Sequence, residues 1–132
     1  MRNAFVIATA ILLAACVHGT RIGDFRPANS PEGAQVQLRL QGERTFRKFE
    51  LFAVDSTGMI VLADRLVHVR WDRLRSIDFV QLGTGYDAYN GKLDVAQRER
   101  IALVSRFPQG LSGPLLAQVL ATLHQDAVSE LP

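Results

Sequence analysis

Apolar and polar residues alternate along the chain from Gln35 onwards. Val36, Leu38 and Leu40 are separated by polar neighbours, which is the period-two pattern of a half-buried β-strand. Turn-forming residues separate four further apolar runs, which predict strands at 45–54, 59–63, 67–71 and 76–81, with a short helical turn at 72–75. Five short strands favour closure into a small antiparallel barrel, because a closed barrel has no exposed sheet edge.

The pattern changes to helical spacing after a glycine-rich loop at 82–92. Asp94 opens the first helix with the spacing of a capping box, and this helix is expected to end before Pro108. Ser112 is expected to cap a second helix, whose apolar stripe continues to Leu131. The two helices are predicted to form a hairpin that packs on the barrel, because a small barrel alone has little core. The alternative is that one helix dimerises or binds a partner.

Residues 1–15 combine a basic start with a short apolar run, which is typical of an export signal. As a helix, about twelve apolar residues would span roughly 18 Å, which is too short for a hydrocarbon core ~30 Å thick. The run ends in Leu13-Ala14-Ala15-Cys16 and resembles the lipobox of bacterial lipoproteins. The resemblance implies cleavage between Ala15 and Cys16, and acylation of Cys16 (palmitate or a similar chain) that anchors the protein to a membrane. The alternatives are an ordinary signal peptide that ends near a chance cysteine, or a buried N-terminal strand.

Val17 follows Cys16 at the position where proteobacterial lipoproteins retained in the inner membrane carry aspartate. The resemblance therefore implies an outer-membrane lipoprotein that faces the periplasm. Beyond Cys16, frequent glycine, proline and asparagine predict a flexible tether, although Ile22 and Phe25 are candidates for packing on the folded domain. The expected organisation is a signal peptide at 1–15, a lipidated N-terminus and tether at 16–34, a small β-barrel at 35–82, and a loop with the helical hairpin at 83–132.

The predicted fold class is α+β, and the strand order resembles that of Sm-like and Src-homology-three-like small barrels. Three features carry the resemblance: the turn at 41–43, the long bent strand at 45–54, and the short turn at 71–76 before the last strand. The resemblance covers the barrel region alone and implies architecture only. The asparagine- and glycine-bearing nucleotide motifs of Sm proteins are absent from the sequence, so no nucleic-acid partner is expected.

Composition restricts the chemistry of the mature chain. Removing residues 1–15 from the 132 residues leaves 132 − 15 = 117, with 15 − 1 = 14 basic side chains against 13 acidic ones. This near-neutral balance gives no general attraction to polyanions. Cys16 is the sole cysteine, so its lipidation leaves no thiol for a disulfide, a metal site or a nucleophile. The histidines, His18, His68 and His124, lack metal-ligand spacing, and no cofactor or metal is expected.

Two groups of residues are candidates for ligand binding. The first is basic and comprises Arg65, Arg70, Arg73 and Arg75, to which Arg39, Arg44, Arg47 and Lys48 are added. Arginine suits carboxylate and phosphate recognition, but interleaved aspartates also allow a solvated, internally paired face. The second group is aromatic and comprises Tyr86 and Tyr89. Exposed aromatic rings stack on sugars or bind a partner protein, and the alternative is that these two rings cover the barrel end. The residues singled out for a ligand are Arg70, Trp71, Arg73, Tyr86 and Tyr89.

No catalytic site is expected. Asp55-Ser56-Thr57-Gly58 resembles the triplet of aspartic proteases but carries an extra residue, and a β-turn explains it. No set of nucleophile, base and oxyanion donors converges in the sequence. The predicted function is therefore a non-catalytic binding or scaffolding module of the cell envelope, with an envelope protein or glycan as its partner. The alternatives are a binder of anionic envelope ligands, such as lipid head groups or cell-wall glycan, through an arginine-rich barrel face, and a small hydrolase with an unrecognised site.

Overall fold

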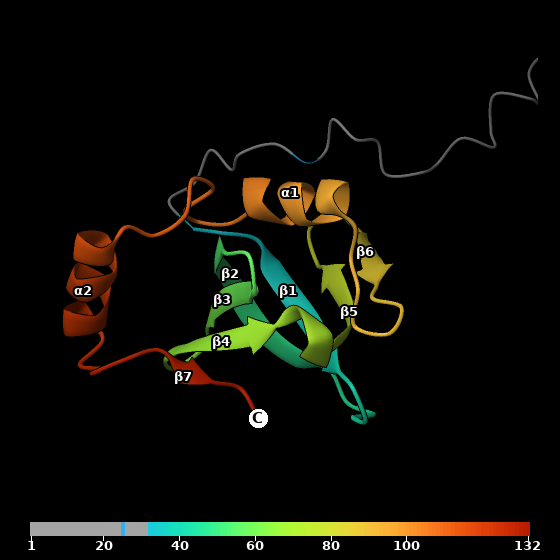
Figure 1. Ribbon diagram of the computed structural model, residues 1–132, viewed down its shortest axis with the longest axis horizontal. Helices are drawn as coiled ribbons and strands as arrows, with labels where there is room; N and C mark the ends of the chain where they lie inside the picture. The colour runs from blue at the N-terminus through green and yellow to red at the C-terminus, as the bar shows by residue number, and fades with distance from the viewer. Residues whose placement is uncertain (1–24, 26–31) are drawn as a thin grey trace, which may run out of the picture.

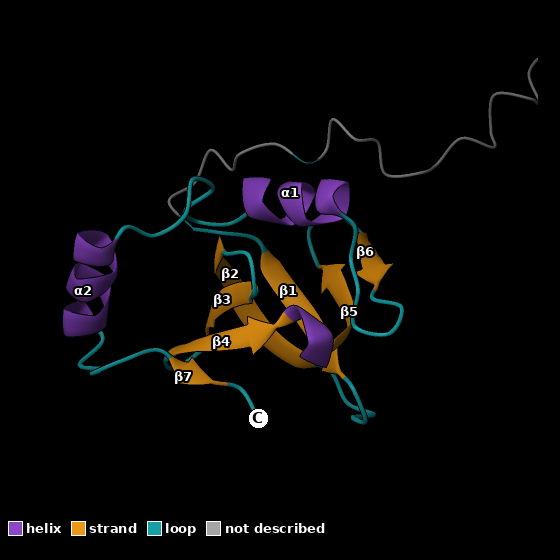
Figure 2. Ribbon diagram, in the orientation of Figure 1, coloured by secondary structure: helices purple, strands orange, loops and turns teal. Residues whose placement is uncertain are grey.

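The computed structural model describes Phe25 and residues 32–132 of the chain. In this part of the chain the fold is α+β, with a seven-stranded sheet and two α-helices (Figures 1 and 2). The strands are β1 (Gln35–Leu40), β2 (Arg47–Val54), β3 (Gly58–Leu62), β4 (Leu66–Arg70), β5 (Leu74–Phe79), β6 (Thr84–Asp87) and β7 (Ser129–Glu130). The helices are α1 (Val95–Leu103), α2 (Gly113–Thr122) and the short 3-10 helix η3 (Trp71–Arg73) between β4 and β5. The α+β class predicted from the sequence is confirmed.

The strands follow the order β6-β5-β1-β2-β3-β4-β7 across the sheet. Neighbours are antiparallel except β4 and β7, which run parallel. The five predicted strands correspond to β1–β5, and η3 occupies the place of the predicted helical turn. The closed five-stranded barrel is not confirmed, because the described sheet is open. Strand β6 pairs with the outer edge of β5 and β7 with the outer edge of β4, so neither edge is left to close a barrel.

One face of the sheet carries the core. In β1, the side chains of Val36, Leu38 and Leu40 are at most 1% exposed, as the alternation predicts. The β1–β5 register places Val36 opposite Phe79 and Leu38 opposite Ile77, and both β5 side chains are buried as well. Burial of each such side chain stabilises the fold by roughly 1.5–3 kcal/mol relative to exposure. The alternation in the sequence therefore identifies the correct face of β1.

Phe25 joins this core from the segment that the sequence predicts as tether. Its ring centroid lies 5.4 Å from that of Phe79 in an edge-to-face arrangement and 5.9 Å from that of Tyr86, and the side chain is 9% exposed. The expectation that Phe25 packs on the domain is confirmed, whereas Ile22 and the proposed lipidation site Cys16 lie outside the described residues. The packed part of the chain therefore includes a residue well before β1.

Helix α1 packs on the sheet and is capped as predicted. The Asp94 carboxylate accepts a hydrogen bond from the Gln97 N–H at 2.7 Å, and the Gln97 amide oxygen accepts one from the Asp94 N–H at 3.0 Å, which is a capping box. Ile101 is 0% exposed. Just after the helix, the carbonyl of buried Val104 accepts a hydrogen bond from the Ala34 N–H at 2.9 Å. The helix is therefore fixed both by its apolar side chains and by backbone bonds at its end.

An ion pair joins the segment after α1 to β2. Arg106 donates to Glu50 Oε1 from Nε at 2.9 Å and from Nη2 at 2.6 Å, and Nη2 also lies 2.7 Å from Oε2. The Glu50 residue is 7% exposed and also accepts a hydrogen bond from the Gly33 N–H at 2.8 Å. A Cβ on Gly33 would lie 2.0 Å from the Leu51 carbonyl oxygen, so only glycine fits beside this carboxylate. Glu50 thus ties the start of the domain to the end of α1.

Helix α2 does not form the predicted hairpin with α1. Figure 1 shows α1 over the sheet and α2 at its side, apart from α1. The N–H groups of Arg106 and Phe107 donate to the Leu51 and Phe52 carbonyls at 3.0 and 2.9 Å, so the connection follows β2 instead of reversing onto α1. No residue of α2 is buried, and Val119 shares a small hollow with Phe52 and Phe107. The hairpin prediction is therefore wrong, although both helices exist.

The second helix is also shorter than its apolar stripe predicts. It ends at Thr122, because His124 adopts a φ of 53°. The N–H groups of His124 and Gln125 bond to the carbonyls of Ala121 and Leu120 at 3.2 and 2.9 Å, which is a left-handed C-terminal cap. Beyond this cap, where the sequence predicts further helical turns, Ser129–Glu130 form strand β7.

The predicted glycine-rich loop at 82–92 contains strand β6. A Cβ on Gly85 would lie 2.2 Å from the Ile77 carbonyl oxygen, so glycine permits the close pairing of β6 with β5. Glycine, which indicates a loop in the sequence, is therefore part of an edge strand here.

Candidate functional site

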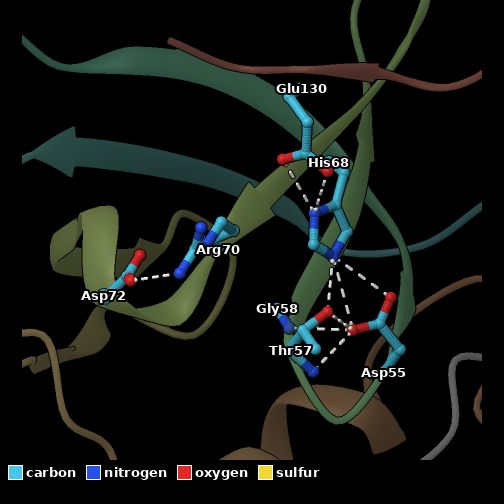
Figure 3. Close-up of polar contacts among 7 residues, drawn as sticks. All are labelled: Asp55, Thr57, Gly58, His68, Arg70, Asp72 and Glu130. Atoms are coloured by element: carbon cyan, nitrogen blue, oxygen red, sulfur yellow. Dashed lines mark hydrogen bonds and ion pairs between the residues drawn. The ribbon is translucent and has the colours of Figure 1, made fainter.

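A histidine held between two carboxylates lies at the β4 edge of the sheet (Figure 3). His68 is on β4, Glu130 is its partner in the β4–β7 register, and Asp55 comes from the turn between β2 and β3. His68 Nδ1 lies 3.0 Å from Glu130 Oε1, and His68 Nε2 lies 3.1 Å from Asp55 Oδ2. We call these three residues the histidine clasp. The clasp links strand β7 to a turn that is remote from it in the sequence.

The Asp55 carboxylate is oriented by its own turn. Its Oδ1 accepts hydrogen bonds from the N–H groups of Thr57 and Gly58 and from the Thr57 hydroxyl, each at 2.8 Å. Burial raises the pKa of Asp55, but the hydrogen bonds from Thr57, His68 and Gly58 outweigh burial and lower the pKa below its usual value of 3.8. The predicted turn is therefore confirmed, and it directs an ionised carboxylate toward His68.

The two carboxylates favour the protonated form of His68. Burial lowers the pKa of His68, but the hydrogen bonds and charges of Glu130 and Asp55 outweigh burial and raise the pKa above 6.5. The Thr57 hydroxyl also lies 3.2 Å from His68 Nε2, so Thr57, His68 and Glu130 follow the order of a nucleophile, a base and an orienting acid. The Thr57 hydroxyl donates to Asp55 Oδ1 at 2.8 Å, and the same carboxylate oxygen lies 3.3 Å from His68 Nε2. The geometry therefore favours an electrostatic contact over a catalytic base.

Beside the clasp lies a hollow of about 550 Å³, which we call the tryptophan hollow. Its lining includes His68, Arg70, Trp71, Asn90, Lys92 and Glu130. Trp71 is 7% exposed, and its buried indole N–H has no hydrogen-bond acceptor among the described residues. Arg70 is paired with Asp72 at 2.6 Å (Figure 3), whereas Lys92 forms no ion pair within the described part of the chain. Among the basic side chains that line the hollow, Lys92 is therefore the one without an ion-pair partner in the described part of the chain.

A second depression, of about 370 Å³, shares Asn90 with the tryptophan hollow, and we call it the arginine groove. Its lining includes Arg39, Arg75, Ser76, Asp87, Tyr89 and Asn90. Arg39 lies opposite Ser76 in the β1–β5 register, so Arg39 and Arg75 come from adjacent strands. The Arg39 guanidinium lies 4.4 Å from the centroid of the Phe46 ring, and its buried Nε has no acceptor among the described residues. Between 32 and 132, neither arginine forms an ion pair.

The residues predicted to bind a ligand lie in different places. Arg70 and Trp71 share the tryptophan hollow, and Tyr89, which is 83% exposed, lines the arginine groove. Tyr86 packs its ring on the aromatic core, as expected for a residue that covers an end of the sheet. Arg73 lies in η3 and lines neither depression. The five residues therefore do not form one site.

Sequence reasoning missed the partners that complete these sites. His68 and Glu130 are 62 residues apart, and Glu130 was assigned to a helix. Arg39 was recognised as a basic residue of β1, but its place beside Arg75 depends on the pairing of β1 with β5. The alternation in β1 does give a usable signal, because it places Arg39 on the face opposite the core. The signal for Glu130 is absent, because its neighbours follow helical spacing.

A scan against protein-family models found no match to this chain, and searches of curated proteins and of solved structures found none either. Over Phe25 and 32–132, no group of three or more histidine, cysteine, aspartate and glutamate side chains is arranged to hold a metal ion. The same residues include no helix that is long and apolar enough to cross a membrane. The geometry of the sites is therefore the basis for inferring function.

Proposed function

We propose that the protein is a lipid-anchored, non-catalytic binding module of the bacterial cell envelope. The lipobox-like Leu13-Ala14-Ala15-Cys16 supports anchorage through Cys16, and Val17 supports an outer-membrane location with the domain in the periplasm. The observation that supports a binding role is the arginine groove, in which two guanidinium groups line one depression without an ion-pair partner among the described residues.

An anionic group is the ligand that the arginine groove favours. A guanidinium presents a planar fork of N–H donors that matches a carboxylate or a phosphate, and Arg39 and Arg75 each bring one to the groove. Asp87 lines the same groove, so the charged side chains of the lining carry a net charge of 2 − 1 = +1. The ligand is therefore a molecule with one anionic group rather than a polyanion.

The rest of the groove favours a sugar as the carrier of that group. The exposed ring of Tyr89 offers an aromatic face for stacking, and Ser76 and Asn90 offer hydrogen-bond partners for hydroxyl or amide groups. Acidic cell-wall glycan combines these features in the envelope. Lipid head groups share the anionic group but lack a ring to stack on Tyr89, so they are the second source to be tested.

Co-sedimentation with insoluble cell-wall glycan and with anionic phospholipid vesicles tests this proposal. Arg39→Gln and Arg75→Gln are each expected to weaken glycan binding about tenfold, because a hydrogen bond to a charged group contributes ~1.5–3 kcal/mol and ~1.4 kcal/mol is a factor of ten. Arg44→Gln is the matched control, because Arg44 is exposed and lines neither depression. Binding that is absent at low salt, or equal in all three variants, would contradict the groove. Binding to vesicles alone would assign the ligand to head groups.

The anchor is tested separately by mass spectrometry of protein extracted from membranes. The mature N-terminus is expected to be Cys16 with acyl groups attached. Cys16→Ala is expected to release the protein from the membrane fraction. A free thiol at Cys16, or an intact segment 1–15 in the mature protein, would refute lipidation.

A scaffold for another envelope protein is the second candidate function, and helix α2 favours it. This helix has ten residues, of which none is charged and none is buried. Photo-cross-linking in intact cells from Leu120 on α2 is expected to capture a partner protein, whereas cross-linking from the exposed Glu99 on α1 is the control. Equal or absent adducts at the two positions would argue against a scaffold that uses α2.

A further inference from the structure

The outer edge of β4 is covered by residues 125–131, which we call the C-terminal strap. The Gln125 side chain acts like a strand residue: its amide oxygen accepts from the Leu66 N–H at 2.8 Å, and its Nε2 donates to the Leu66 carbonyl at 2.7 Å. Strand β7 follows in parallel register, and the Leu131 N–H donates to the His68 carbonyl at 2.9 Å. The strap therefore occupies backbone groups that would otherwise be open to another strand.

Few interactions hold the strap in place. Strand β7 has two residues, and no residue from 124 to 132 is buried. The His68–Glu130 contact involves a Glu130 side chain that is 64% exposed, and exposed ion pairs contribute ~0–1 kcal/mol. The apolar contact of the strap is Leu131, which is partly buried and packs against the core, so a competing strand must supply an apolar residue in its place.

The same edge continues into a region with basic side chains. Strand β7 is parallel to β4 and lies opposite Val67 and His68, so continuing this register would place position 131 opposite Val69 and position 132 opposite Arg70. Arg70 and Lys92 line the tryptophan hollow at this end of β4. Trp71 lines the same hollow, and its buried indole N–H has no acceptor in the described part of the chain.

The charges around His68 define what a competing strand must carry. Asp55 faces His68 from the β2–β3 turn, and Glu130 faces it from the strap. Removing the strap would leave His68 with one carboxylate, so an incoming strand would need an acidic residue in the place of Glu130. Farther along, Asp72 is paired with Arg70, and Lys92 is the cation without an ion-pair partner among the described residues.

We propose that the β4 edge is a docking site for an extended, acidic segment of a partner protein, which pairs with β4 in place of the C-terminal strap. Backbone hydrogen bonds along Leu66 and His68 supply the affinity of such strand addition, and the side chains at alternate positions supply its selectivity. One acidic residue lies beside His68, and a following one reaches Arg70 and Lys92. This site is separate from the arginine groove and requires no ligand there.

A labelled peptide with the sequence of residues 125–132 is the probe for the open edge. In the intact chain the strap competes with the peptide at an effective concentration in the millimolar range, so binding is expected to be weak. Gln125→Ala with Glu130→Gln in the full-length protein weakens the strap, and we expect the peptide to bind this variant at least about tenfold more tightly. Gln125→Ala alone is the second variant, because it keeps the histidine clasp. Adding Arg39→Gln to the strap-weakened variant is expected to leave its affinity for the peptide unchanged, which separates this site from the arginine groove.

Two peptide controls identify the mode of binding. A peptide N-methylated at the position of Leu131 lacks the donor to the His68 carbonyl, and its binding is expected to be lost. A peptide with Pro132→Asp places an acid near Arg70 and is expected to bind more tightly, with the gain removed by Arg70→Gln. No binding to either strap-weakened variant, or equal binding of the N-methylated peptide, would overturn the proposal. A concentration-dependent dimer of the strap-weakened variant would also overturn it, because a second copy's strap would then be the occupant.

Discussion

Of the two helices α1 and α2, the one with the more apolar sequence, α2, is the less buried. Helix α1, with the sequence VAQRERIAL, carries charged residues and yet buries Ile101 completely. Helix α2, with the sequence GPLLAQVLAT, has no charged residue and buries none of its side chains. Apolar content therefore does not decide which helix joins the core of this protein.

The attachment of each helix to the sheet explains the difference. The segment that follows α1 bonds to the sheet region through Val104 and Arg106, and the Glu50 carboxylate holds Arg106 on β2. These bonds fix α1 over the core face, where its few apolar residues are well placed. Helix α2 begins only after the chain has left this face, and it lies at the side of the sheet (Figure 1). Position along the chain thus limits which apolar surface a helix can bury.

Removal of the buried side chain of α1 is expected to have the largest effect on stability. Ile101→Ala is expected to lower the free energy of unfolding by ~2–5 kcal/mol, because it leaves a cavity at a position that is 0% exposed. Leu120→Ala in α2 is the matched control and should cost less than ~1.5 kcal/mol, because Leu120 is not buried. Urea denaturation of both variants checks the difference. Equal losses would show that α2 contributes as much to the core as α1.

The next effect concerns the ion pair that holds the end of α1. Glu50→Ala is expected to cost about 2–3 kcal/mol, because it leaves Arg106 and the Gly33 N–H without their buried acceptor, while Arg106 keeps some contact with solvent. Glu43→Ala breaks the more exposed Glu43–Arg47 pair and is expected to cost less than ~1 kcal/mol. Thermal denaturation of the two variants should separate them clearly, and a similar shift in both would argue against Glu50 as the fixing residue.

Smaller effects are expected at the two helix starts. Asp94→Ala removes a capping box with bonds of 2.7 and 3.0 Å and should destabilise the protein by ~1 kcal/mol. Ser112→Ala removes one longer bond, at 3.3 Å to the Leu115 N–H, from a helix that buries nothing, and should have about half that effect. Chemical denaturation at neutral pH measures both. A larger loss for Ser112→Ala would reverse the ranking of the two helices.

The smallest effect is the pH dependence of the histidine clasp. The pKa of His68 is raised, so its stabilising contribution is fully present below pH 6.5 and is lost as the pH rises through the folded-state pKa. The pKa of Asp55 is lowered, so its contribution is present above pH 3.8 and is lost as the pH falls through its folded-state pKa. His68→Gln should therefore reduce stability at pH 5.5 by ~0.5–1 kcal/mol and much less at pH 9. A pH-independent loss would mean that packing rather than charge explains the role of His68.

Much of the sheet could be predicted because its signals are local. The alternation around Leu38 and the turn at Asp55 each depend on a few adjacent residues, and both are confirmed. The capping box at Asp94 is equally local. Strand β6 was missed because Gly85 has no side chain to alternate, and the end of α2 was missed because His124 adopts a left-handed conformation that glycine usually takes.

The candidate sites were harder to predict because they depend on pairings across the chain. The histidine clasp joins Asp55, His68 and Glu130 from three segments, and no local pattern connects them. Arg39 and Arg75 share a groove only because β1 pairs with β5. The closed barrel was expected because closure protects sheet edges, whereas the described chain protects them with β6 and β7. The expectation that the sheet edges are protected was correct. The spacing of apolar residues in the sequence did not show that two additional strands protect them.

The docking of Phe25 has a consequence for where the protein works. If Cys16 carries lipid, 25 − 16 = 9 peptide steps join Cys16 to Phe25, whose side chain packs on the domain. Nine steps of extended chain reach at most about 30 Å. The domain would then stay in a thin layer next to its membrane, and any molecule that it binds must enter that layer.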